Sequence, residues 1–594
     1  MRPRTETPNQ AGRALLSLVL LTALALAPVL VADYIRLDDF QHVVENPGLQ
    51  GMSGPALFEF WARPYFGLYI PVTYSIWWLA SGVAHLFGTL RQTAWLFHAL
   101  NLGLHLANTC LVFLTTRTLL HQCREKHPSL NAASIPSMAF LAAWLFALHP
   151  VQVETVAWVS ECKGGLSLLF GLLGIWSYGR RAGKHVTAIL LVAAVLSKPV
   201  AIVIPGILLL FDRILLGRDL KKSIEMPSVL WLLFLPVVVI TKHLQPNLDI
   251  DFVPTILHRI YVAGDALSFY LSKLFLPSSL ALDYGRSPQY VLAHVRGWQV
   301  AVSSVVLLAA VAIPAEVLLR SRPRSLWYAF LACGWSVFVL ALLPVLGLIP
   351  FEFQDFSTVA DRYMYVAMFG AALALVGILI RFQAGRRSLA ITVAILTLLT
   401  GLSFNQATKW RSTETLFAHT LRVNPRSYVA HYSIAGDLID HGHLDEGIGR
   451  ARQALDIKPD YLPAQVAIGV GWTRKSQLQM AIDCYSAALA NASSAGRRHA
   501  AVLATLHNNL GTLLRQVGRR VEGTEHFRKA AEVNPKSLNA YLNLAEAALD
   551  DGQYLEAIVQ FQHALALSPG NASIESQLAR ARRGARKALF GESR

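Results

Sequence analysis

The sequence predicts an all-α chain in two parts, a polytopic membrane domain over residues 1–405 and a helical repeat domain over residues 406–594. Of the 594 residues, 54% are hydrophobic and only 15% are charged, and the mean hydropathy is +0.41. An ordinary soluble domain does not have that balance over such a length. The apolar excess ends near residue 405, and the polar sequence beyond it contains regularly spaced prolines.

The net charge of +16 is carried by basic clusters that lie between apolar segments. This distribution is typical of cytoplasmic loops, which fix the topology of a membrane protein. The sequence contains no zinc-finger, homeodomain or RRM pattern, so we expect a lipid bilayer and no nucleic acid as partner. The five cysteines are scattered and give neither a disulfide framework nor a metal-ligand spacing.

Apolar segments and basic loops together predict about eleven membrane crossings. Arg2, Arg4 and Arg13 place the N-terminus in the cytoplasm. Two further segments, 67–87 and 257–276, are interrupted by interfacial or charged side chains and are predicted to lie along the membrane surface. The crossings are expected near residues 13–32, 93–116, 137–149 and 164–180, twice within 186–215, and near 228–241, 298–319, 326–349, 363–381 and 388–405. The repeat domain is then extracytoplasmic, on the outer side of the inner or plasma membrane if the chain is bacterial.

The polar C-terminal part contains repeats. Prolines 425 and 459 are 34 residues apart, as are prolines 535 and 569, and the gap between these pairs fits two more units. Residues 543–561 alternate small and large side chains as in a tetratricopeptide (TPR) helix pair. We expect four to five TPR units with a concave groove that recognises a peptide or protein. A structural cap or an oligomerisation arm is the alternative.

Polar residues are predicted to gather on the outer face of the membrane domain. Asp38 and Asp39 follow the first span, and two carboxylates are costly to place in lipid. The same face is expected to hold the hairpin tip with His149 and Glu154, the turn at Lys198, and the segment with Asp361, Arg362 and Tyr363. The outer half of the second span adds His98, Asn101 and His105, which share one helix face.

Each of these groups also has a structural interpretation. The two aspartates could cap a helix or form a solvated turn, and His98, Asn101 and His105 could form hydrogen bonds between helices. His149 and Glu154 could cap a helix, Lys198 could snorkel, and Asp361 and Arg362 could form a local ion pair. The sequence has no P-loop, GxSxG or HExxH motif, which argues against an ATPase, a hydrolase of those classes and a zincin.

Several motifs in order resemble one known family. They are Leu37-Asp38-Asp39, Tyr69-Ile70-Pro71-Val72-Thr73, Phe97 to Asn101 with His105, Phe146 to Ser160, Leu196-Ser197-Lys198-Pro199, Ala360 to Tyr365, and Trp410-Arg411 before the TPR units. The chain is similar to the TMTC-like transmembrane and TPR-containing O-mannosyltransferases, in particular the prokaryotic-type members. Cys162 and Gly164 stand where members usually carry Arg and Asp around Lys163, and Ile70 replaces an Arg found in many eukaryotic members.

The resemblance implies a GT-C glycosyltransferase fold with an inverting active site at the outer face and a sugar on polyprenyl phosphate as donor. It implies that Asp38 is the general base for the acceptor hydroxyl and that Asp39 positions the acceptor or tunes Asp38. Lys198 and Arg362 are the candidate ligands of the donor phosphate. The other candidate site residues are His98, Asn101, His105, His149, Glu154, Lys163, Asp361 and Tyr363. No cofactor is certain, but Asp38, Asp39 and His149 could hold a divalent metal.

The leading hypothesis is transfer of a mannose-like sugar from a polyprenyl-phosphate donor to a hydroxyl of an exported protein that the TPR groove presents. A second hypothesis keeps the same enzyme but makes a lipid or envelope glycan the acceptor. A third is a non-catalytic membrane scaffold whose TPR units assemble a complex, which leaves the polar residues beside the membrane unexplained.

Overall fold

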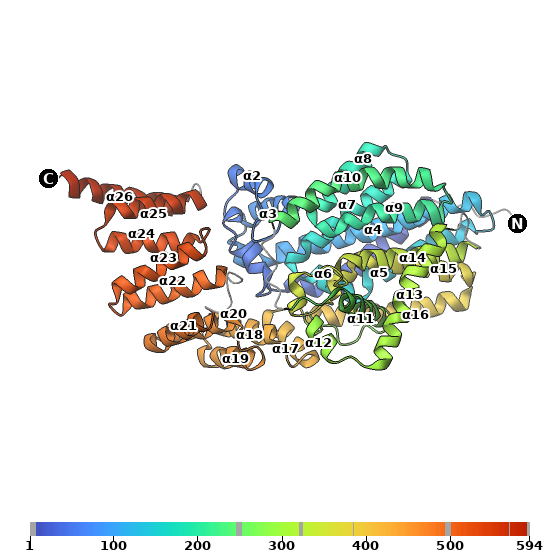
Figure 1. Ribbon diagram of the computed structural model, residues 1–594. Helices are drawn as coiled ribbons and strands as arrows, with labels where there is room; N and C mark the ends of the chain where they lie inside the picture. The colour runs from blue at the N-terminus through green and yellow to red at the C-terminus, as the bar shows by residue number, and fades with distance from the viewer. Residues whose placement is uncertain are drawn as a thin grey trace. The chain divides into compact units, whose positions relative to one another are not determined.

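The computed structural model describes residues 8–244, 252–319, 325–383, 385–492, 500–568 and 571–590. Every regular element in these ranges is a helix, which confirms the predicted all-α class. The chain divides into two compact units, Met1–Pro425 and Arg426–Arg594 (Figure 1). The sequence predicted the boundary between the two domains at residues 405 and 406, whereas the two units of the structure divide after Pro425. In the structure the segment up to Pro425 packs on the first unit, where Thr413 Oγ1 accepts from the Arg36 backbone N–H at 3.0 Å.

Within the described residues, the first unit is built from seventeen α-helices. They are α1 (Pro8–Leu26), α2 (Gly54–Ala62), α3 (Pro71–Ala84), α4 (Ala94–Lys126), α5 (Ile135–Leu148), α6 (Val153–Ala157), α7 (Cys162–Gly179), α8 (Lys184–Ser197), α9 (Ile204–Leu210), α10 (Leu220–Leu244), α11 (Ile256–Phe275), α12 (Pro288–Ala293), α13 (Gly297–Leu319), α14 (Leu326–Leu342), α15 (Met364–Arg381), α16 (Arg386–Thr408) and α17 (Thr413–Val423). Figure 1 shows α4, α7, α9 and α10 running roughly parallel within this unit.

Seven stretches in the described residues are long and apolar enough to cross a membrane. They are Ala11–Val31, Ala94–Lys126, Leu220–Thr241, Gly297–Leu319, Leu326–Val345, Asp361–Arg381 and Arg387–Thr408. A bent pair, Ala132–Leu148 with Pro150–Ala157, makes eight if it counts as one span. The multi-pass prediction is therefore confirmed, whereas the count of eleven stays a prediction. The expected double crossing within 186–215 corresponds to two short helices, α8 with 14 residues and α9 with 7.

A sharp break in the chain at His149 shapes the centre of the first unit. His149 has extended backbone angles (φ −80°, ψ 132°), as expected because the following Pro150 disfavours the α region at this position. The two helical segments on either side of it are bent by 53°. After the break the chain forms α6 and a short 3-10 helix, Val159–Glu161, before α7 begins at Cys162. Residues 149–163 therefore follow a compact, buried path between two helices.

Close packing of α14 against α15 fixes the helix that follows the Asp361–Tyr363 segment. A Cβ atom at Gly334 would lie 2.5 Å from the Gly370 carbonyl oxygen, and one at Gly377 would lie 2.6 Å from the Trp327 carbonyl oxygen. Small residues let membrane helices approach this closely. The short helix Asp361–Tyr363 leads directly into α15, so this contact also fixes the position of Arg362.

The second unit consists of successive antiparallel helix pairs, as TPR units predict. Its helices are α18 (Tyr428–Asp440), α19 (Leu444–Ile457), α20 (Leu462–Arg474), α21 (Leu478–Ala492), α22 (Ala500–Gln516), α23 (Arg520–Val533), α24 (Leu538–Asp550), α25 (Tyr554–Leu567) and α26 (Ala572–Phe590).

Equivalent turns in the four pairs carry a residue in the left-handed region: Gly442 (φ 87°), Ser476 (φ 59°), Gly518 (φ 86°) and Gly552 (φ 73°). A residue in this conformation commonly ends a helix. The four described pairs and the final helix agree with the predicted four to five units, and prolines 425, 459 and 535 follow α17, α19 and α23 as expected. Pro569 lies outside the described residues.

Candidate active site

The two adjacent aspartates after the first span have different environments. Asp39 is fully buried, and its two oxygens accept three hydrogen bonds. They come from the Ile35 N–H at 3.0 Å, the Ser160 N–H at 2.8 Å and the Ser160 hydroxyl at 2.6 Å. Burial raises the pKa of Asp39 to about 6 against the opposing effect of these hydrogen bonds. Asp39 thus joins the loop after the first span to the segment before α7.

The side chain of Asp38, by contrast, is 37% exposed. Its Oδ2 lies 3.9 Å from Nζ of Lys163, which is the second residue of α7. A short π-helix, Phe40–Val44, begins directly after the pair, and such segments are frequent at functional sites. A carboxylate that is held near one cation and still open to solvent is the kind of group that can accept a proton from a ligand.

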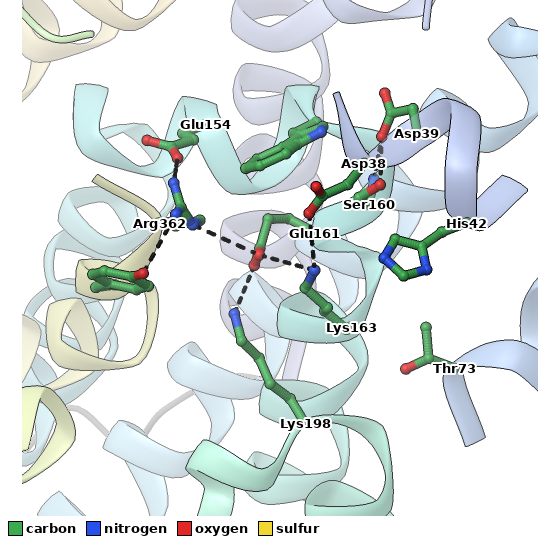
Figure 2. A network of polar contacts seen from close by, with 12 residues as sticks. Asp38, Asp39, His42, Thr73, Glu154, Ser160, Glu161, Lys163, Lys198 and Arg362 are labelled. Carbon is green, nitrogen blue, oxygen red and sulfur yellow. Dashed lines mark hydrogen bonds and ion pairs between the residues drawn. The ribbon is translucent and has the colours of Figure 1, made fainter. Parts of the chain in front are cut away.

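Glu161 lies at the centre of the polar network that Figure 2 shows. Its Oε2 accepts from Lys198 Nζ at 2.8 Å, and its Oε1 lies 3.7 Å from Lys163 Nζ and 4.0 Å from Arg362 Nε. The Glu161 side chain is 3% exposed. Burial alone would raise its pKa, but Lys198, Lys163 and Arg362 together hold the pKa below its ordinary value. One ionised carboxylate therefore gathers three cations from three separate elements.

The Arg362 guanidinium is fixed by a second carboxylate and by aromatic rings. Its Nη1 donates to Glu154 Oε1 at 2.5 Å, and its central carbon lies 4.1 Å from the centroid of the Phe353 ring. It also lies 5.2 Å from the Trp158 ring and 4.8 Å from the Tyr363 ring. Arginine stacks on aromatic faces in this way while its N–H groups remain directed at anions.

Lys198 stands at the junction of α8 with the short helix Pro199–Val203. The residue before it is held in place by α3, because the Thr73 hydroxyl donates to the Ser197 carbonyl at 3.0 Å. Lys198 and Arg362 line one pocket, together with Gly164, Ser167, Tyr363 and Tyr365 among others. The two predicted phosphate ligands therefore meet at one pocket, which also adjoins the Glu161 network.

Three of the predicted site residues on α4 and at the helix break instead hold the backbone around this centre. His105 contacts the Tyr365 hydroxyl at 3.0 Å and the Ala147 carbonyl at 2.9 Å, and Asn101 donates to the Trp158 carbonyl at 2.7 Å. His149 contacts the Leu274 carbonyl at 3.1 Å and accepts from the Val151 N–H. His98 is also fully buried on α4. For Asn101, His105 and His149, the structural interpretation describes the observed contacts.

Asp361 and Arg362 do not pair with each other in the described contacts. Asp361 Oδ1 accepts from the Tyr284 hydroxyl at 2.7 Å, while Arg362 pairs with Glu154. The described residues contain no group of three or more His, Cys, Asp or Glu side chains that could hold a metal ion. Asp38, Asp39 and His149 are thus not gathered into a metal-binding group among the described residues.

Two central residues, Ser160 and Glu161, are absent from the predicted site. Ser160 closes the longest motif of the sequence, and Glu161 follows it directly. An acidic residue two positions before a lysine is a usable signal at a predicted outer hairpin tip, because buried carboxylates need charged partners. The identity of those partners depends on the fold, since Lys198 and Arg362 are distant from Glu161 in the sequence.

Sequence comparison finds curated relatives that are similar to this chain over most of its length. Protein O-mannosyl-transferase Tmtc3 of Drosophila melanogaster is 24% identical over 75% of this chain and 56% of that protein. F38B6.6 of Caenorhabditis elegans is 22% identical over 77% of this chain and 65% of that protein, and TMTC4 of Mus musculus is 23% identical over 69% and 62%. The predicted resemblance to the TMTC family is confirmed. The chain spans between about half and two thirds of the length of these relatives.

The repeats are also matched separately. A tetratricopeptide repeat family model matches residues 526–559, which cover the second half of α23, all of α24 and the start of α25. Among solved structures, a thermophilic TPR protein of Thermus thermophilus is 20% identical over 33% of this chain and 96% of that chain, with a TM-score of 0.25. The predicted TPR repeat is thus confirmed by the family model.

Proposed function

We propose that the chain is an integral-membrane, inverting glycosyltransferase of the GT-C type. It transfers a mannose-like sugar from a polyprenyl-phosphate donor to a hydroxyl of an exported protein. The observation that carries the proposal is the pocket lined by Lys198 and Arg362, whose cations connect through Glu161 and Lys163 to the exposed carboxylate of Asp38. The names of the relatives, which are protein O-mannosyl-transferases, support the same reaction class.

We assign donor binding and proton transfer to the two ends of the polar network. Lys198 and Arg362 bind the donor phosphate and stabilise the charge that develops on it as the sugar leaves. Asp38 takes the proton of the acceptor hydroxyl, whose oxygen bonds to the anomeric carbon while the bond to the phosphate oxygen breaks. The electron pair of that bond stays with the phosphate. Attack on the face opposite the leaving group inverts the anomeric centre.

The repeat unit gives the enzyme a means to recognise a protein. TPR solenoids form extended binding surfaces, and this unit is compact in its own right. In this proposal the basic N-terminus is cytoplasmic and the number of crossings is odd, as the sequence predicts, so the TPR unit is extracytoplasmic, where a lipid-linked donor replaces nucleotide sugars. Acceptor binding by the TPR groove and reaction in the first unit are therefore assigned to separate parts.

The test is transfer by the purified full-length protein in lipid nanodiscs, with radiolabelled polyprenyl-phosphate mannose and a panel of exported proteins. Protein-linked label that requires Asp38 supports the proposal. Asp38→Asn should lower transfer by about a hundredfold or more while the protein still folds and inserts. Full activity in this variant, or the absence of any binding of polyprenyl-phosphate sugars, would favour a membrane scaffold instead.

The boundary between the two units provides a direct test of one alternative, namely a lipid or envelope glycan as acceptor. Truncation after Pro425 removes the TPR unit at its structural boundary and keeps α17 on the first unit. If the acceptor is a protein held by the TPR groove, the truncated chain should lose transfer to protein. If the acceptor is a lipid or glycan, transfer to that acceptor should survive the truncation.

A further inference from the structure

Two of the three cations around Glu161 also line the proposed phosphate pocket. Lys198 is both the 2.8 Å partner of Glu161 and a pocket-lining residue, and Arg362 is the second residue common to both. We propose that Glu161 is an internal counter-anion, which competes with phosphate for Lys198 and Arg362 and thereby allows the spent polyprenyl phosphate to leave. This inference rests on the proposed function and assigns a positioning residue to the same site.

The reaction itself creates the need for such a group. The phosphate of the donor is a diester with one negative charge. When the acceptor oxygen bonds to the anomeric carbon, the bond from that carbon to the phosphate oxygen breaks and its electron pair stays on the phosphate. The product is a monoester, whose charge near pH 7 is about −1.5 to −2. A cluster of cations therefore binds the product more tightly than the donor, and slow product release can limit turnover.

A fixed negative charge among the cations counteracts this imbalance. Coulomb energy scales with the charge of the ligand, so a carboxylate repels a dianion about twice as strongly as a monoanion. Glu161 has that position because its carboxylate is buried among Lys163, Lys198 and Arg362. It lowers the affinity for the product more than the affinity for the donor.

The wall of the pocket shows that this carboxylate is close enough to act. Gly164 lines the pocket, and a Cβ atom at Gly164 would lie 2.9 Å from Glu161 Oε2 and 3.6 Å from Lys198 Nζ. The Glu161–Lys198 contact thus lies directly against a pocket-lining residue. Figure 2 shows the Lys198 and Lys163 side chains converging on Glu161 from different segments.

The experiment measures binding of undecaprenyl phosphate to the full-length protein in nanodiscs, alongside single-turnover and steady-state transfer. Glu161→Gln should bind undecaprenyl phosphate about tenfold more tightly, because the cations lose their counter-anion. Steady-state turnover should fall, while the single-turnover rate should fall much less. The matched control is Glu225→Gln, which removes the carboxylate of an exposed ion pair with Lys184 and should leave binding and turnover unchanged. A merely structural role for Glu161 predicts weaker binding instead.

Two further variants test the charge balance and remain informative if Glu161→Gln fails to fold. Lys163→Gln should weaken binding of undecaprenyl phosphate, and the double variant Glu161→Gln/Lys163→Gln should return the affinity to within about threefold of wild type, because the net charge of the cluster is restored. Unchanged or weaker binding by Glu161→Gln, or a double variant no different from Lys163→Gln, overturns this inference alone. If the wild-type protein binds no undecaprenyl phosphate, both this inference and the proposed function fail.

Discussion

Asp39 and Glu161 are both buried carboxylates beside Ser160, since Asp39 accepts two hydrogen bonds from Ser160 and Glu161 follows it in the chain, but they have opposite kinds of partners. Asp39 accepts from two backbone N–H groups and one hydroxyl, all of them neutral. Glu161 is surrounded by three charged side chains from three elements. Neutral partners fix the course of the chain, whereas a surplus of cations beside a pocket provides a binding site for an anion. The comparison therefore indicates a structural role for Asp39 and places Glu161 in the anion-binding part of the site.

The largest effect is expected at Asp38, the exposed neighbour of Asp39. Asp38→Asn should lower transfer by about a hundredfold or more, which is the usual contribution of a general base. Thermal unfolding should change little, because the side chain is 37% exposed and its ion pair with Lys163 spans 3.9 Å. Comparable losses of activity and stability would contradict the assignment of Asp38 to chemistry.

Asp39→Asn should reverse that pattern. An amide has only one oxygen acceptor, so its N–H₂ group would face a donor that the carboxylate now satisfies. We expect a loss of about 1–3 kcal/mol in unfolding free energy. Urea or thermal unfolding in detergent would measure it. A fully stable Asp39→Asn protein with no transfer would mean that Asp39, too, acts in the chemistry.

The pH dependence of stability gives a second check on Asp39. Its pKa in the folded protein is about 6, above the ordinary value of 3.8, so the folded state binds more protons between these values. The unfolding free energy of the wild type should therefore fall as the pH rises from about 4 to about 6 and then level off. Asp39→Asn should lack this component. A wild-type profile that parallels the variant across this window would show that Asp39 does not titrate there.

A smaller effect is expected from the helix-linking residues of α4. His105→Leu removes the contacts with the Tyr365 hydroxyl and the Ala147 carbonyl. Hydrogen bonds between membrane helices contribute about 0.6–2 kcal/mol each, so we expect a modest loss of stability with donor binding retained. Loss of undecaprenyl phosphate binding in a stable His105→Leu protein would instead show that His105 contributes to ligand binding.

The sequence predicts individual charged residues of this site, but not the contacts between residues that are distant in the sequence. Asp38, Lys198 and Arg362 were predicted because isolated charges beside apolar segments are conspicuous, and Lys163 was predicted from the family resemblance; the structure joins the four in one network. His149 was predicted for the same site, but its ring contacts backbone groups. A histidine at a helix break has the same sequence pattern whether it binds a ligand or a carbonyl. The central position of Glu161 was not predictable, since it depends on which distant cations the helix packing brings together.

The smallest effect is expected at Gly164, which separates the pocket from the Glu161 network. Gly164→Ala places a Cβ atom 2.9 Å from Glu161 Oε2, so the carboxylate must shift, and we expect the shift to lengthen its contact with Lys198. If Glu161 is the counter-anion, this shift should tighten binding of undecaprenyl phosphate by about twofold to fivefold, in the same direction as Glu161→Gln. Gly103→Ala is the matched control, because a Cβ atom at that position in α4 meets nothing within 4 Å. A change of equal size in Gly103→Ala would show a general effect of adding a methyl group, and weaker binding in Gly164→Ala would mean that the methyl group blocks the pocket.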